Sequence, residues 1–527
     1  MEEIQYLGAL EEILVEHRAF GDSDYIHEQV EICYQRRLGK LSADVPVARA
    51  LEDALCQADA RHRRRILGDP AVRFAVNSAL RQSQTGIRCG IPLDECEEVF
   101  RATLRCLEEC KSGVPLEFGA KVNHLGSGPY HGGVWSGDSS DLFGRVFRCA
   151  VKQRFEKKCE PGAELSKPTA DQLAMLTNGL LLLDELVPSL SRTASSHVGL
   201  IALFPKTPWK GAASMSGFEL SGAIFLCGDL LQNPWWVAEH FLHEALHQKL
   251  YDFRHGHSLL MPNFAREDAP RVWSPWNVPG ANKSNYWDTH RAVAAFHVYV
   301  HLALLSAIAE ERAHELEKVY GPLRHSKSGT MTDSRKAMER AHYLGEKIQE
   351  VCYQELGTAG KRLIEWLISV LDALDDSPPP ANSYVHLLLD RYQVEALRAG
   401  IRIQLSLTET PSSTFEGEAS ISSDVTQQLT KLAKREIERT RSVLSAVNAG
   451  AELTQFENAL DKYSDEELGR KFPQVRDLIS NTILGLSQDG YRLKSASPGS
   501  NATEEIVKQM IEDSSGHLHR IFEPSSS

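Results

Sequence analysis

The pattern H-E-x-x-H, formed by His243, Glu244 and His247, constrains this chain more than any other feature of its sequence. Residues four apart on an α-helix project from the same face, so the two imidazoles can converge on one cation. Apolar residues recur at helical spacing through residues 237–250, and Pro234 suits the first turn of such a helix. The pattern predicts a metal-binding helix with Glu244 beside the metal. The alternative is a core helix whose two histidines are hydrogen-bonded within the protein.

A third metal ligand has two candidates downstream. In the segment DTHRAVAAFHVYVHLALL, His290, His297 and His301 fall on one narrow stripe of a predicted helix. His290 stands in the first turn and is the favoured ligand, whereas the two deeper histidines are expected in the core or hydrogen-bonded to ligands. The rival is Glu267, which lies in a loop before Pro270.

The composition of the chain indicates how many domains it forms, which classes of partner it does not bind and in which cellular compartment it is expected. The chain has 527 residues, 42% of them hydrophobic, which predicts about two to four packed units. Its net charge is -13 and its basic residues form no block, so neither nucleic acid nor membrane is expected as a partner. The N-terminus lacks the basic start and apolar run of a signal peptide, which predicts a cytoplasmic protein. The apolar run 293–309 contains two histidines and is expected to be a buried core helix.

Hydrophobic periodicity predicts a mainly α (α+β) fold, with helical N- and C-terminal regions around a metal-binding core that holds a small β-sheet. The apolar runs 197–204 and 222–227 have strand length, and Thr169 with Gln172 forms a capping box that opens a helix. Further helices are expected at 333–374, 384–398 and 424–448. The predicted regions are a helical N-terminal region (1–123), the H-E-x-x-H core with the sheet (124–310), a helical C-terminal region (311–493) and a flexible tail (494–527).

Four stretches carry a resemblance to a known family. The segments EHFLHEALHQKLYDF, RVWSPW and DTHRAVAAFHVYVHLAL, together with the upstream RRRILGDPAVRFAVNSAL, resemble H-E-x-x-H-type peptide β-hydroxylases that depend on 2-oxoglutarate. Such enzymes occur with the biosynthesis of ribosomally made, modified peptides. The resemblance spans roughly residues 60 to 305 and rests on short motifs.

The resemblance implies an iron(II) oxygenase that hydroxylates a peptide or a related biosynthetic intermediate. It makes His243, His247 and His290 the iron ligands and leaves Glu244 beside the metal. Where the family's loop often reads Ser-Pro-Trp-Arg, this chain has Asn277 after Trp276. The role of that arginine in binding the keto acid's carboxylate is then either lost in this chain or taken by Arg271 or Arg291, since the planar guanidinium fork suits a carboxylate.

Two other functions fit the same residues. In a zinc metallopeptidase, Glu244 would be the general base, and the predicted strand 222–227 would offer its edge to a peptide substrate. A metal-stabilised peptide-binding protein is the second alternative. Three histidines accept zinc as readily as iron, so the residues alone leave the choice open.

Overall fold

The computed structural model of the chain describes residues 2–87, 90–112, 118–125, 130–156, 159–209, 212–276, 286–323, 333–378, 418–446 and 449–488, with single positions at 387–401 and 508–521. These residues form two compact units. The first consists of Met1–Ala269 and Thr289–Pro378, and the second of Pro270–Asp288 and Pro379–Ser527. The predicted region boundaries after residues 123 and 310 both lie inside the first unit.

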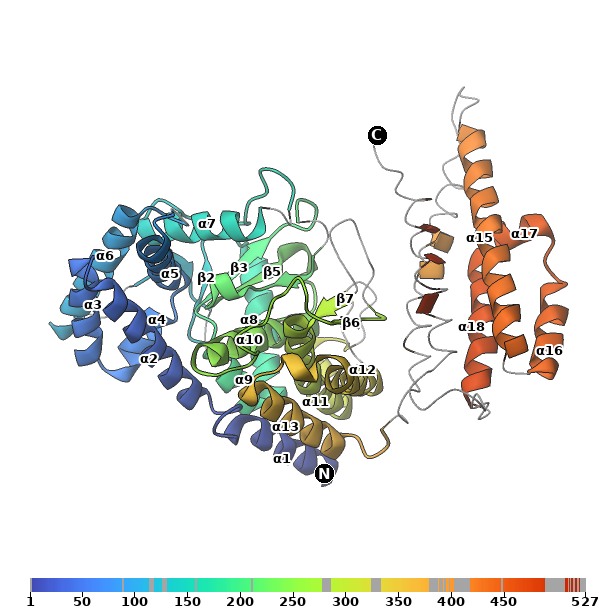
Figure 1. Ribbon diagram of the computed structural model, residues 1–527, viewed down its shortest axis with the longest axis horizontal. Coiled ribbons are helices and arrows are strands. Elements are labelled where there is room, and N and C mark those ends of the chain that lie inside the picture. The colour runs from blue at the N-terminus through green and yellow to red at the C-terminus, as the bar shows by residue number, and fades with distance from the viewer. Residues whose placement is uncertain are drawn as a thin grey trace. The chain divides into compact units, whose positions relative to one another are not determined.

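The first unit is mostly helical (Figure 1). Before the sheet region come six helices: α1 (Glu2–Glu16), α2 (Ser23–Leu41), α3 (Pro46–Gln57), α4 (Ala60–Leu67), α5 (Pro70–Thr85) and α6 (Leu93–Lys111). The other helices are α7 (Leu142–Phe155), α8 (Ala170–Leu186), α9 (Pro188–Ser195), the short η1 (Phe218–Leu220) and η2 (Gly228–Leu230), α10 (Pro234–Gly256), α11 (Thr289–Tyr320), α12 (Ser334–Lys347), the π-helical η3 (Ile348–Cys352), η4 (Tyr353–Glu355) and α13 (Thr358–Leu374).

A five-stranded sheet lies at the centre of this unit, in the order β1-β2-β3-β5-β4. Its strands are β1 (Val122–Asn123), β2 (Gly133–Trp135), β3 (Leu200–Phe204), β4 (Ser214–Met215) and β5 (Ala223–Cys227). The central strands β2, β3 and β5 run parallel, while β1 and β4 are antiparallel edges. The strand predicted at 222–227 therefore lies between two partners, and the expectation that it offers a free edge is wrong. Strand pairing is non-local, so a strand's position in the sheet cannot be read from its own residues.

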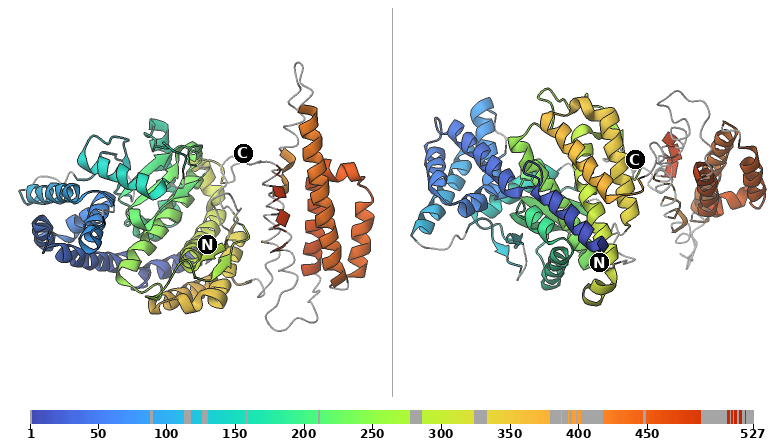
Figure 2. Two further views of the ribbon diagram at one scale, coloured as in Figure 1. Left: turned by 45° about the horizontal axis from the view of Figure 1, so that its top comes forward. Right: turned by 90° about the horizontal axis from the view of Figure 1, so that it is seen from below.

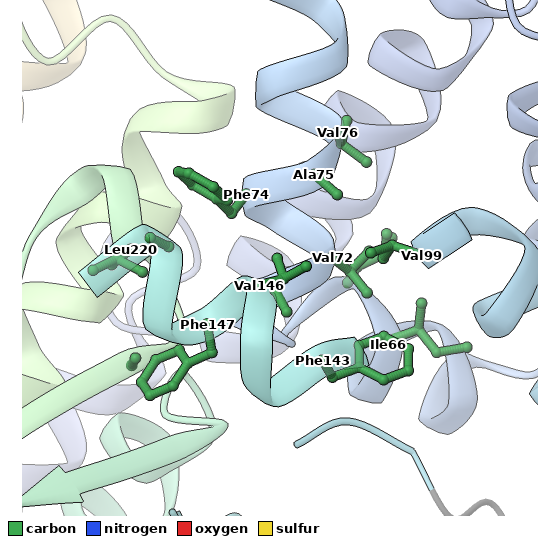
Figure 3. Close-up of a cluster of buried hydrophobic side chains, with 14 of the residues drawn as sticks. Ile66, Val72, Phe74, Ala75, Val76, Val99, Phe143, Val146, Phe147 and Leu220 are labelled. Atoms are coloured by element: carbon green, nitrogen blue, oxygen red, sulfur yellow. The ribbon is translucent and has the colours of Figure 1, made fainter. Parts of the chain in front are cut away.

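Both faces of the sheet are covered, which explains the continuous apolar runs in β3 and β5. Leu200, Ala202 and Phe204 of β3 join one hydrophobic cluster with α5, α6 and α7, whereas Ile201 and Leu203 are buried on the opposite face. Figure 1 shows α7 on one side of the sheet and α8 and α10 on the other. Figure 3 shows how α5 and α7 meet in this cluster, for example through Val72, Val146 and Phe143.

Helices that are far apart in the sequence pack against one another in the first unit. Helix α1 packs against both α11 and α13, as the views in Figures 1 and 2 show. Among the described helices, α11 alone is long and apolar enough to cross a membrane by length and composition. In its most apolar window 83% of the residues are buried inside the structure, as in the core helix of a soluble protein.

The second unit contains a two-stranded sheet and a set of helices. The elements are β6 (Arg271–Trp273), β7 (Tyr286–Asp288), α15 (Glu418–Ala446), α16 (Gly450–Leu460), α17 (Asp465–Arg470) and α18 (Phe472–Gln488). Trp273 packs in the hydrophobic cluster of this unit. Most of the predicted tail, 494–527, lies outside the described residues. The described positions at 508–521 are helical and include the fully buried Ile511.

The prediction of a mainly α fold with small sheets is confirmed. The capping box of Thr169 and Gln172 opens α8, and both predicted strands are present as β3 and β5. The helix predicted at 333–374 is divided into α12 and α13 by the short π-helix η3 and the 3-10 helix η4. The helix predicted at 384–398 lies largely outside the described residues.

Candidate metal centre

Helix α10 carries the H-E-x-x-H pattern, as predicted. The Asn233 side chain caps it by accepting a hydrogen bond from the Trp235 amide over 2.9 Å, and Pro234 occupies the first turn. The helix brings the rings of His243 and His247 together, with centroids 4.9 Å apart. The local pattern thus produces the pair of imidazoles on one helix face.

These two imidazoles are chemically suited to bind a metal. Neither makes a hydrogen bond with any described residue, and His247 Nδ1 is buried without a partner. Burial lowers the pKa of His243 and lowers that of His247 well below its ordinary value, so both rings are neutral at pH 7, the form that ligates metals. Glu244 is only 3% exposed and its Oε2 is also buried without a partner. Unsatisfied buried polar atoms of this kind call for an ion or a water as partner. The donor atoms of His243, Glu244 and His247 do not all lie within 4.8 Å of one another, so the three do not yet converge on one point.

His290 lies close enough to this pair to lower the pKa of His247, and the rings of both residues are neighbours of Tyr251. The Tyr251 ring is 6.2 Å from that of His247 and 6.4 Å from that of His290, measured between centroids. His290 Nε2 accepts a hydrogen bond from Arg254 Nη1 over 2.6 Å. The donor atoms of His243, His247 and His290 do not all lie within 4.8 Å of one another, so ligation by all three needs a side-chain movement.

Buried polar side chains of α10, Gln248 and Lys249, form hydrogen bonds with other parts of the first unit. Gln248 Oε1 accepts from the Gly222 amide over 2.7 Å, and its Nε2 donates to Ala223 O over 3.0 Å. Lys249 Nζ donates to Gly21 O, and burial lowers the pKa of this lysine to about 7. The sheet and the turn after α1 therefore set the position of the predicted ligands.

Asp252 is the centre of a second buried cluster. Its Oδ1 pairs with Arg73 Nη1 over 2.6 Å, and its Oδ2 with His197 Nδ1 over 2.8 Å. His197 Nε2 is 3.0 Å from Ser23 Oγ, and the His27 ring stacks on His197 with centroids 4.2 Å apart. In the described chain, His27, His197 and Asp252 form the one group whose donor atoms all lie within 4.8 Å.

This second cluster is better explained as a structural anchor than as a metal site. Arg73 already neutralises Asp252, and a dication beside that guanidinium would be repelled. Ser23, His197 and Asp252 are hydrogen-bonded in the same succession as the serine, histidine and aspartate of a hydrolase triad. All three side chains are buried, however, and Ser23 Oγ also donates to Thr193 O over 3.0 Å, so this serine is not placed to attack a substrate.

The other predicted site residues are distributed as follows. Arg291 is exposed in the first turn of α11 and is close enough to His247 to lower the pKa of that ring. Arg271 lies on β6 in the second unit, with Nη1 3.8 Å from Asp288 Oδ2. Glu267 is exposed in the loop after α10, and no metal-binding group among the described residues includes it. Asn277 lies outside the described residues.

His240, Trp235 and His301, which lie near the motif, have hydrogen-bond partners within the chain. His240 Nδ1 donates to Trp236 O over 3.0 Å and its ring stacks on Trp236, and the Trp235 indole donates to Gly321 O over 2.9 Å. His301 Nδ1 donates to His297 O over 2.7 Å. His297 Nδ1, however, is buried without a partner.

Arg254 is the residue near this site that the sequence interpretation missed. It stands seven residues after His247 and eleven after His243, offsets that return to nearly the same helix face. The helical spacing of the sequence therefore already placed Arg254 on the same face as the two histidines. No family model and no curated protein matches the chain.

Proposed function

We propose that this chain is a non-haem iron(II) oxygenase, dependent on 2-oxoglutarate, that hydroxylates a peptide or a similarly sized biosynthetic intermediate in the cytoplasm. The observation that carries the proposal is the pair of neutral imidazoles, His243 and His247, next to the orphaned carboxylate oxygen of Glu244. His290, from the neighbouring helix, is the third ligand in this proposal. The family-like motifs favour the oxygenase over other metal enzymes.

Each part of the site would have a defined task. The three histidines would hold the metal through neutral nitrogens, and Glu244 would add negative charge beside it. The metal, when bound, supplies the coordination positions at which a keto acid and dioxygen react. One oxygen atom of dioxygen enters a carbon–hydrogen bond of the substrate and the other enters succinate, while the keto acid loses carbon dioxide. The chain itself would position the half-buried histidine rings and limit the access of water to them.

Anaerobic reconstitution with iron(II) tests this proposal. After 2-oxoglutarate, dioxygen and candidate peptides are added, we expect succinate and a peptide heavier by about 16 daltons, one oxygen atom, in equal amounts. His247→Ala should give neither product, and His314→Ala, a change at an exposed position on α11, should give both. Succinate without a hydroxylated product from any substrate would contradict the substrate class. Absence of stoichiometric metal in the wild-type chain would contradict the whole proposal and favour a peptide-binding protein.

A zinc metallopeptidase is the second candidate, and the burial of Glu244 favours it. A general base works best where its carboxylate is held close to the metal-bound water and away from bulk solvent. Glu244 Oε2 is buried away from bulk solvent, and this carboxylate is close enough to His243 to act on its pKa, which supports this candidate. Zinc-dependent peptide cleavage that is lost in Glu244→Gln, with the metal retained, would decide for this candidate.

A further inference from the structure

Arg254 brings a positive charge next to a predicted metal ligand. It lies in the last turn of α10, and its Nη1 donates to His290 Nε2 over 2.6 Å. The guanidinium also sits over the Phe218 ring, with Cζ 4.5 Å from the ring centroid. Burial lowers the pKa of Arg254, but an arginine keeps its proton at any physiological pH. A permanent, partly buried cation therefore lies beside His290.

This cation has no carboxylate partner within the described part of the chain. Glu219 is near enough to raise the pKa of Arg254, but its carboxylate is paired with Arg154 Nε at 2.8 Å. One imidazole nitrogen and one aromatic face occupy only part of a guanidinium that offers five N–H donors. A partly buried charge without a counter-ion is unfavourable, so the surroundings of Arg254 favour the binding of an anion.

We propose that Arg254 binds a carboxylate of an acidic ligand. The identity of the ligand rests on the proposed function: in the oxygenase it is the distal carboxylate of 2-oxoglutarate. The planar fork of an arginine matches a carboxylate in a bidentate manner, and Phe218 holds the plane of this fork. Arg254 thus takes the role that the sequence interpretation gave to Arg271 or Arg291.

The positions of the three arginines support this choice. Arg291 is exposed, and Arg271 belongs to the second unit, near Asp288. Arg254, in contrast, is part of the same helix as His243 and His247 and touches His290 directly. A binding group held on a rigid helix beside a metal ligand keeps a short dicarboxylate in a defined orientation.

The same contact couples the anion to the metal. Arg254 donates to Nε2 of His290, and a metal ligated through this nitrogen would have to displace the guanidinium. A carboxylate that draws Arg254 away makes Nε2 accessible, so the acidic ligand and the metal strengthen each other's binding. This coupling is reciprocal by thermodynamic linkage.

Calorimetry on the chelator-treated full chain tests the proposal without turnover. Nickel(II), which imidazoles bind well, is titrated alone, and 2-oxoglutarate is then titrated into the nickel-loaded protein. In Arg254→Met we expect 2-oxoglutarate to bind about 10- to 100-fold more weakly, because a charged hydrogen-bond pair is lost. Nickel alone should bind more tightly, because a cation that competes for His290 is gone. Arg254→Lys should also lose 2-oxoglutarate affinity, since an ammonium lacks the fork.

The matched control is Arg105→Met, at an exposed position on α6 away from the site, which should change both affinities less than about two-fold. A circular-dichroism melt equal to that of the wild type shows that Arg254→Met is folded. Unchanged 2-oxoglutarate affinity in Arg254→Met, or an equal loss in Arg105→Met, would overturn the proposal. Failure of the oxygenase is a different result: the keto acid would bind in an Arg254-dependent manner, but no succinate would form.

Discussion

Arg73 Nη1 on α5 lies 2.6 Å from Asp252 Oδ1 on α10, with the two side chains 3% and 1% exposed. The pair connects the N-terminal helices to the helix that carries His243 and His247. Arg73 and His197 hold the pKa of Asp252 far below its ordinary range against the opposing effect of burial. The ionised Asp252 carboxylate, paired with Arg73 and His197, thus anchors the H-E-x-x-H helix to the rest of the first unit.

Replacing Asp252 by Ala should destabilise the first unit strongly. Arg73 would remain buried without its counter-ion, for which losses of about 3–5 kcal/mol are typical. Urea denaturation followed by circular dichroism measures the change. The control is Asp24→Ala, whose ion pair with Arg64 is exposed at the surface and is expected to contribute about 1 kcal/mol or less. Equal stability of the two variants would contradict the anchoring role of Asp252.

The buried imidazoles of His27 and His197 predict a loss of stability in acid. Burial is the largest cause that lowers the pKa of both rings from the ordinary value of 6.5, with Asp252 opposing it. The unfolded chain takes up these protons near pH 6.5 and the folded chain does not, so the free energy of unfolding falls as the pH drops below that value. Each ring contributes about 1.4 kcal/mol per pH unit.

Thermal melts between about pH 8 and pH 5 measure this dependence. His27→Gln keeps a polar side chain opposite Ser196 but removes one titrating group. We expect a shallower decline of the melting temperature in this variant below pH 6.5 and no difference in slope above it. An unchanged slope would show that His27 does not carry the effect.

Removal of a predicted ligand should remove the metal. His243→Ala and His247→Ala should each abolish a stoichiometric divalent cation, because two ligands hold a catalytic metal poorly. His290→Ala should do the same, whereas Glu267→Ala should retain the metal. Metal analysis after purification without chelators measures this, with His314→Ala as the exposed control. Loss of metal in Glu267→Ala but not in His290→Ala would reverse the assignment of the third ligand.

Gln248 is expected to fix the distance between α10 and the sheet. Gln248→Leu would leave the buried Gly222 amide and Ala223 carbonyl without their partners, at a cost of about 1–3 kcal/mol for each unsatisfied group. The exposed Gln232, which bonds to Asp229 O, provides the control: Gln232→Leu should change stability by about 0.5 kcal/mol or less. Denaturant titration of both variants distinguishes the two cases. A loss in Gln248→Leu no larger than in the control would exclude this role.

Local patterns in the sequence were enough to predict most elements near the site. The spacing of apolar residues predicted α10, the capping box of Thr169 and Gln172 predicted the start of α8, and strand-length runs predicted β3 and β5. Each of these features depends on residues within one or two turns of one another. The histidines of the α11 apolar run predicted a buried core helix, and 83% of the residues in its most apolar window are buried.

The sequence by itself determined that His243 and His247 share one helix face, because that follows from the helical period alone. Only the tertiary structure decided that Arg254 meets His290, that β5 lies inside the sheet, and that Asp252 is partnered by Arg73 and His197. These partners lie 36 to 179 positions apart in the chain. Such contacts depend on which helix faces pack together, and that is set by burial across the whole core and not by any local pattern.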